Sequence, residues 1–252
     1  MRLKTEKKGL ADYFRSYTHP DGIVVCEEKK FVYMRPAKTA GTSILRSTLE
    51  KKISGIITAK DHPEKFNQWL ENITDNDLND YFIFAVVRNP WDRAVSSAVY
   101  LDLELSDLLH NFEHHSKTEK KRIHTLPLSI YTHCNNKLFT DFICRYECLQ
   151  ADMNLVFDAL GIDRQELPWV NKSKRKNYTD YYTQAEIVKV AELYQSDIKN
   201  FGYAFDPKPS VVSYTHTESV IINIKIQIKK LGRRLGLISK KQKFINSENK
   251  KN

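Results

Sequence analysis

The segment Tyr81–Val87 is apolar at every position and lacks the alternation of apolar and polar residues that marks a half-buried strand. Such a run is typical of a strand covered on both faces, as in a parallel sheet between two layers of helices. Arg88 follows it, and Pro90 stands where the first turn of a helix can dispense with an amide proton. We therefore expect a central strand, a short loop and a helix over Trp91–Leu109.

The order strand, loop, helix recurs along the chain. Phe31–Met34 precedes apolar residues at helical spacing over 44–49, and Asp141–Glu147 precedes a predicted helix over Leu149–Leu160. A further helix is expected where apolar residues line one face between Ile187 and Ile198. Alternating strands and helices predict an α/β fold in which helices flank a central parallel sheet.

The positive charge of the chain is concentrated at its C-terminal end. The net charge is +9, but residues 206–252 hold 11 lysines and arginines against 3 acidic residues, whereas residues 1–205 hold 29 against 28. A nucleic-acid-binding domain would carry a basic face on its folded part, so this distribution argues against a nucleic-acid partner. We expect one domain over 1–205 and a basic tail over 206–252.

Within the tail, isoleucines and leucines recur at helical spacing between Ile221 and Ile238, with basic residues between them. The pattern predicts a basic amphipathic helix, whose apolar stripe would either pack on the domain or contact a membrane surface peripherally. The isoleucines at 222–228 also alternate as in a strand. No apolar run is long enough to span a bilayer and none follows the N-terminal lysines, so we expect a cytoplasmic protein.

The cysteines and histidines give little sign of a metal site. The 4 cysteines form no C-x-x-C pair and match no standard spacing of zinc ligands. One helical turn separates His110 from His114, but two histidines alone are a weak indication of a metal site. We expect reduced thiols and no metal ion.

The loop Pro36–Ser43 lies between the first predicted strand and its helix. Backbone amides and the positive end of a helix dipole at such a loop form a site for an anion. It is not a Walker A loop, because Lys38 precedes Gly41 rather than following a second glycine. A plain helix cap is the alternative reading. The candidate binding residues are Lys38, Thr39, Ala40, Gly41, Thr42 and Ser43.

A second candidate site follows the central strand. Arg88 leaves that strand and Ser96 lies about two turns into the next helix, so both can converge on one anion. The alternative is a surface ion pair between Arg88 and Asp92, with Ser96 as a packing residue. Parallel strands end at one edge of a sheet, where open α/β folds bind ligands. The two loops therefore predict one ligand with two phosphate-like ends.

The strings PAKTAGTS (36–43) and VVRNPWDRAVSS (86–97) resemble the 5'-phosphosulfate loop and the 3'-phosphate site of carbohydrate sulfotransferases, which use 3'-phosphoadenosine 5'-phosphosulfate (PAPS). Further segments resemble the same family in the same order: Asp141–Glu147, Leu167–Ser173, Tyr181–Tyr182 and Phe201–Tyr203. The resemblance implies the P-loop-NTPase-like sulfotransferase fold, PAPS as the donor and a carbohydrate hydroxyl as the acceptor.

The resemblance also implies roles for the site residues. Lys38 would contact the 5'-phosphate and the bridging oxygen as that oxygen becomes an anion, while Arg88 and Ser96 would hold the 3'-phosphate. The reaction would need no metal. A basic stretch after Asn171 either closes over the nucleotide or is an exposed loop; it consists of Ser173, Lys174 and Arg175.

The general base is left open. His62 is the first candidate, because relatives place a histidine or glutamate between the two loops, and Asp61 and Glu64 compete with it. Many relatives have a Lys-His pair where this chain has Gly55–Ile57, and Leu-Pro-His where it has Leu167–Trp169. Both departures remove polar groups.

Two other functions are weighed against sulfuryl transfer. A P-loop nucleotide kinase would need a Walker A lysine and acidic ligands for Mg²⁺, and the sequence shows neither. A non-catalytic protein that binds an anionic polymer or a membrane through the tail would leave both loops unexplained. The sequence does not indicate which carbohydrate is the acceptor or how many copies assemble.

Overall fold

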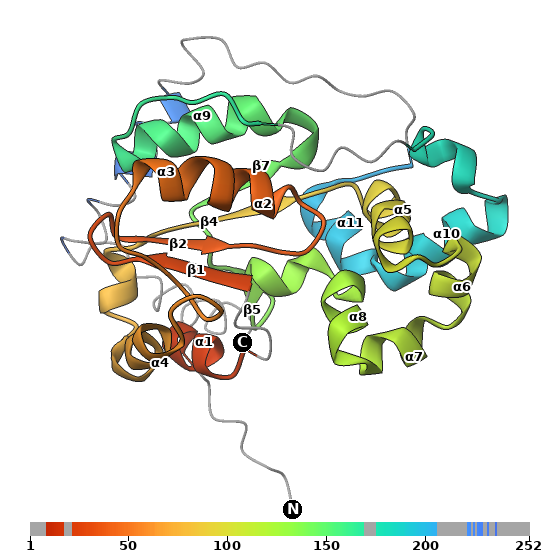
Figure 1. Ribbon diagram of the computed structural model, residues 1–252, viewed down its shortest axis with the longest axis horizontal. Helices are drawn as coiled ribbons and strands as arrows, with labels where there is room; N and C mark the ends of the chain where they lie inside the picture. Colours follow the sequence, from red (N-terminus) through yellow and green to blue (C-terminus); the bar gives the residue numbers. More distant parts are fainter. Residues whose placement is uncertain are drawn as a thin grey trace, which may run out of the picture.

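The computed structural model describes residues 9–17, 22–168 and 175–205, together with 221, 222, 224, 226–228, 231 and 235. Its centre is a five-stranded sheet with helices on both faces (Figure 1). The spatial order of the strands is β3 (Ile56–Thr58), β1 (Ile23–Cys26), β2 (Phe31–Met34), β4 (Phe82–Val87) and β7 (Phe142–Arg145).

The sheet is mixed. β2, β4 and β7 run parallel to one another, which confirms the three strands and the parallel arrangement predicted from the sequence. β1 is antiparallel to both β2 and β3, and the sequence analysis did not predict either β1 or β3. β1 and β2 form a hairpin over residues 27–30, where Lys30 has a φ of 50°. This left-handed residue closes a turn that contains no glycine.

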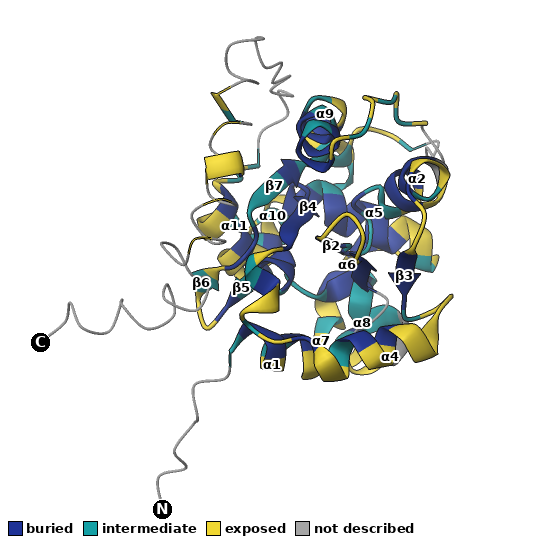
Figure 2. Cartoon of the chain, turned by 90° about the vertical axis from the view of Figure 1, so that its left-hand side faces the viewer, coloured by how far each residue is buried: buried dark blue, intermediate teal, exposed yellow. Residues whose placement is uncertain are grey.

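The alternating side chains of β4 enter two different cores. Phe82, Phe84 and Val86 pack on one face, and Ile83 and Ala85 pack on the other. Because both faces are covered, every position of the strand is apolar. Figure 2 shows the buried residues gathered on the strands and on the inward sides of the helices.

Different segments of the chain supply the helices that cover the two faces of the sheet. One face carries the segment that runs through α2 (Gly41–Ile44), a π-helical turn (Leu45–Leu49) and α3 (Glu50–Lys52), together with α9 (Leu149–Leu160). The other carries α1 (Leu10–Arg15) and α4 (Pro63–Asn72). Gly161, with a φ of 63°, ends α9 at the position the sequence indicates.

A helical group lies beside the sheet, at the right of Figure 1. Residues of the first, second and fifth of its helices form its apolar core. The group consists of α5 (Pro90–Leu101), α6 (Leu105–His110), α7 (Phe112–Lys117), α8 (Glu119–Thr125), α10 (Gln184–Leu193) and α11 (Gln195–Phe201).

Two predicted helices are each interrupted. The helix predicted over Trp91–Leu109 breaks at Asp102, which adopts a left-handed φ of 54° and caps α5. The helix predicted between Ile187 and Ile198 divides at Tyr194 into α10 and α11. In both cases the apolar spacing continues across the break, because both pieces pack into the same core.

Only part of the tail lies within the described residues. Ile226 is 5% exposed and packs in the core of the sheet face that carries α9, and Ile222 lies against the same core. The other described apolar residues of the stripe are exposed: Ile221, Ile224, Ile228, Leu231 and Leu235. The domain boundary after residue 205 and the long amphipathic helix remain predictions. Among the described residues, no helix has the length and apolar character needed to cross a bilayer.

Candidate active site

The sequence-predicted loops lie at one edge of the sheet. Met34 of β2 is in register with Ala85 of β4, so the loops that follow these parallel strands emerge side by side. Val24 pairs with both Tyr33 and Thr58, which places the end of β3 near the end of β2. The expectation that Pro36–Ser43 and Arg88 share an edge is confirmed.

The loop Pro36–Ser43 has a constrained backbone. Lys38 and Ala40 have φ values of 67° and 62°, in the left-handed region that side chains other than glycine rarely adopt. Thr39 is buried, and its hydroxyl donates to the carbonyl of Pro36 at 2.9 Å. The hydroxyl of Thr39 therefore maintains the loop itself. Ala40 precedes the first turn of α2 as its N-cap residue.

Gly41 has a packing role. A Cβ atom at this position would lie 2.7 Å from Nε of Arg35, closer than side chains can approach. The side chain of Arg35 occupies the space beside this glycine. Ser43 is buried and Thr42 is exposed, so the two hydroxyls at the start of α2 differ in access to solvent.

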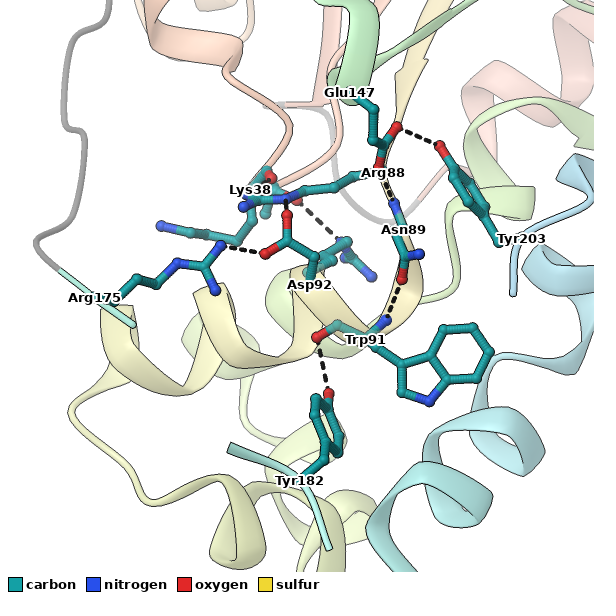
Figure 3. Close-up of polar contacts among 11 residues, drawn as sticks. Lys38, Arg88, Asn89, Trp91, Asp92, Glu147, Arg175, Tyr182 and Tyr203 are labelled. Atoms are coloured by element: carbon teal, nitrogen blue, oxygen red, sulfur yellow. Dashed lines mark hydrogen bonds and ion pairs between the residues drawn. The ribbon is translucent and has the colours of Figure 1, made fainter. Parts of the chain in front are cut away.

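Arg88 connects the two loops directly. Its Nη1 donates to the carbonyl of Lys38 at 2.8 Å, and its Nε donates to Oδ2 of Asp92 at 2.7 Å (Figure 3). Its guanidinium also lies 3.9 Å from the ring centroid of Tyr146. The side chain is only 5% exposed. The ion pair with Asp92 anticipated from the sequence therefore exists, but it is buried rather than on the surface.

Asp92 binds a second guanidinium from a distant segment. Nη2 of Arg175 donates to Oδ1 of Asp92, so each carboxylate oxygen of Asp92 accepts a hydrogen bond from one arginine. Burial by itself would raise the pKa of Asp92, but the charges and hydrogen bonds of Arg88 and Arg175 outweigh it and hold that pKa below its ordinary value. Nη1 of Arg175 is buried and has no hydrogen-bond partner among the described residues.

Lys38 adds a third cation to this cluster. Its Nζ lies 4.2 Å from the ring centroid of Tyr100. Burial, and then the charges of Arg88 and Arg175, lower the pKa of Lys38 to about 8. Three basic side chains thus lie in one cluster with a single carboxylate, that of Asp92, which contacts two of them, Arg88 and Arg175. The surplus of positive charge suits an anion with more than one negative charge.

Arg93 is a site-forming residue that the sequence analysis missed. It is 1% exposed and donates to the backbone carbonyls of Ala37 and Leu126 at 3.2 and 2.8 Å. It thereby holds the first loop against the chain that follows α8. The sequence feature that could have indicated this role is the position of Arg93, a charged residue on an otherwise apolar face of α5. Ser96, one turn beyond Asp92 on α5, is buried as well.

Glu147 fixes the turn that carries Arg88. Its Oε1 accepts from the amide of Asn89 at 2.6 Å, and its Oε2 accepts from the hydroxyl of Tyr203 at 2.9 Å (Figure 3). The Asn89 side chain donates to the carbonyl of Ala204 at 3.0 Å. Tyr182 donates to the carbonyl of Trp91 at 2.8 Å. Segments far apart in the sequence therefore converge on the start of α5.

The three candidate bases lie around the start of α4. Oδ2 of Asp61 accepts from the hydroxyl of Thr58 at 2.6 Å and from Nη2 of Arg46 at 2.7 Å. These partners, Thr58 foremost, lower the pKa of Asp61, which makes it a weak base. His62 and Glu64 are exposed, with His62 at the N-cap position. The contacts of Asp61 with Thr58 and Arg46 count against Asp61 as the base.

Some predicted residues lie outside the described part of the chain. Ser173 and Lys174 are among them, as is Trp169. Arg175 is described and lies in the cluster. Within the described residues, no group of three or more histidine, cysteine, aspartate or glutamate side chains is arranged to hold a metal ion.

A family model described as "Sulfotransferase family" matches residues 21–204, from just before β1 to just after α11. Because this match covers well over half of the chain, the protein belongs to the sulfotransferase family. It is a transferase, and its reaction is the transfer of a sulfuryl group. No curated protein and no solved structure matches the chain.

Proposed function

We propose that the protein transfers the sulfuryl group of PAPS to a hydroxyl of a carbohydrate by in-line displacement. The observation that supports PAPS as the donor is the cluster of Lys38, Arg88 and Arg175 at the ends of β2 and β4, in which one carboxylate, Asp92, binds the two arginines. PAPS has a 3'-phosphate and a 5'-phosphosulfate, and so presents the two anionic ends that the two loops would bind. Carbohydrate as the acceptor is supported by the resemblance of the loop strings.

In this proposal Lys38 acts at the leaving group. The S–O bond to the 5'-phosphate breaks as the acceptor oxygen bonds to sulfur, and the bridging oxygen becomes an anion. An ammonium group beside that oxygen stabilises charge that develops only in the transition state. The amides and hydroxyls at the start of α2, from Gly41 to Ser43, would hold the 5'-phosphate.

Arg88, Arg175 and Ser96 would bind the 3'-phosphate. Arg88 uses Nε and Nη1 for its contacts with Asp92 and Lys38, which leaves its Nη2 for the phosphate. Nη1 of Arg175 would be the second guanidinium nitrogen to contact that phosphate. Asp92 aligns both groups before the donor binds, so little ordering is needed on binding. Ser173 and Lys174 would continue the same basic segment.

The acceptor hydroxyl must lose its proton as the new S–O bond forms. His62 is our candidate for the base, because it follows β3 at the same edge and is exposed. The proton would pass to a ring nitrogen of His62, and the products would be the sulfated carbohydrate and adenosine 3',5'-bisphosphate.

Donor specificity provides the first test. Adenosine 3',5'-bisphosphate should raise the melting temperature of the protein much more than equal concentrations of ATP or adenosine 5'-phosphate. Lys38→Ala should abolish transfer from labelled PAPS, and Lys51→Ala, an exposed lysine on α3, is the matched control. Stronger stabilisation by ATP would support the kinase alternative. A panel of glycans with labelled PAPS then tests the acceptor.

A further inference from the structure

Tyr100 stands out among the aromatic residues near the site. It lies in the last turn of α5 and is 59% exposed, yet its ring contacts Lys38 of the candidate site. Nζ of Lys38 lies 4.2 Å from the ring centroid, within the range of a cation–π interaction. The ring of His124, which is buried, lies 4.7 Å from the ring of Tyr100 and supports it.

The surroundings of Lys38 explain why such a contact matters. Asp92 forms ion pairs with Arg88 and Arg175, and among the described residues Lys38 forms no ion pair with a carboxylate. Burial and the two guanidinium groups favour the neutral amine of Lys38. A neutral amine would not neutralise a leaving oxygen. A group that places negative potential beside this amine would extend the pH range over which Lys38 stays charged before the donor binds.

We propose that Tyr100 is a positioning residue whose ring holds the Lys38 ammonium at the site, in place of a counter-ion, until the anionic donor arrives. The face of an aromatic ring carries negative potential and attracts an ammonium group. The interaction uses the ring and not the hydroxyl, so phenylalanine should substitute for tyrosine. This inference rests on the proposed role of Lys38 in transfer.

The groups that face Lys38 come from three segments. Arg88 follows β4, Arg175 lies in the segment before α10, and Tyr100 belongs to α5, with His124 of α8 behind its ring. The two arginines oppose the charge on Lys38, and the ring favours it. Replacing the ring by an aliphatic side chain leaves both opposing charges in place, so the amine should lose its proton more readily.

The test measures the proton affinity of Lys38 without relying on activity. The rate at which acetic anhydride acetylates Lys38 follows the neutral amine, and mass spectrometry of the peptide that contains Lys38 gives that rate at each pH. In the wild type the midpoint should lie near 8. Tyr100→Phe should leave it unchanged, and Tyr100→Leu should lower it by about half a pH unit. Equal midpoints in the wild type and Tyr100→Leu would overturn the proposal.

A second measurement separates this inference from the proposed function. Adenosine 3',5'-bisphosphate should protect Lys38 from acetylation, and its affinity for Tyr100→Leu should match the wild type near pH 6.5 but be about threefold weaker near pH 9. An affinity that falls equally at both pH values would mean a merely structural role and would overturn the inference. A lowered midpoint without protection by the nucleotide would uphold the contact between ring and lysine and refute the proposed donor site.

Discussion

Raising the pH should weaken the binding of adenosine 3',5'-bisphosphate far more steeply than an ordinary lysine would allow. Lys38 has a pKa of about 8, because it is buried beside Arg88 and Arg175. The pKa of this base is lowered, so its charge is present below about pH 8 and is lost as the pH rises through that value. An anion that binds the ammonium form must then supply the free energy needed to protonate the amine again.

The magnitude follows from the pKa. Between about pH 7.5 and about pH 9.5 the protonated fraction of Lys38 falls about 25-fold, whereas that of a lysine with the ordinary value of 10.5 would fall by only about a tenth. The affinity should fall by the same factor of about 25, or about 2 kcal/mol, if the neutral amine contributes nothing to binding. Phosphate monoesters are fully ionised over most of this interval, so the ligand itself changes little.

Isothermal titration calorimetry across this pH range provides the assay. The matched control is Lys38→Arg, because the guanidinium keeps its charge throughout and should give an almost flat profile. A flat profile in the wild type would refute the reasoning about Lys38. An equally steep profile in Lys38→Arg would show that another group is responsible.

Four further predictions concern other parts of the molecule. Arg88→Ala should reduce the preference for adenosine 3',5'-bisphosphate over adenosine 5'-phosphate by at least about tenfold in calorimetry, since a charge-assisted hydrogen bond to the 3'-phosphate is lost; unchanged discrimination would place that phosphate elsewhere. His62→Ala should lower kcat on the order of 10² with donor affinity unchanged, and near-normal turnover would exclude His62 as the base. Asp197 is buried and accepts hydrogen bonds from the amides of Leu128 and Ser129 and from the Ser129 hydroxyl, so Asp197→Ala should lower the free energy of unfolding in urea by about 3 kcal/mol; a loss below about 1 kcal/mol would contradict this. Ile226→Ala should cost about 2 kcal/mol in the same assay, whereas Ile224→Ala, at an exposed position, should cost little; equal effects would show that Ile226 does not pack in the core.

Local sequence patterns were sufficient for the parallel part of the sheet. The continuous apolar run of β4 reports burial on both faces, because each face requires its own apolar side chains. The loops after β2 and β4 could be assigned to one edge of the sheet because parallel strands must end together. β1 was missed because the turn between β1 and β2 uses Lys30 in a left-handed conformation instead of a glycine, so no glycine marks the turn. β3 was missed because it is shorter than the strands that were predicted.

The sequence by itself determined which segments lie at the carboxyl edge of the parallel strands and which charges they carry, because Pro36–Ser43 and Arg88 each follow a strand that is recognisable from its apolar residues. Only the tertiary structure decided how those charges are arranged. The pairing of Asp92 with Arg175, the hydrogen bond from Asn89 to Glu147 and the ring of Tyr100 beside Lys38 all join segments that come together only after folding. The proton affinity of Lys38 depends on burial and on these neighbours, and a sequence pattern records neither.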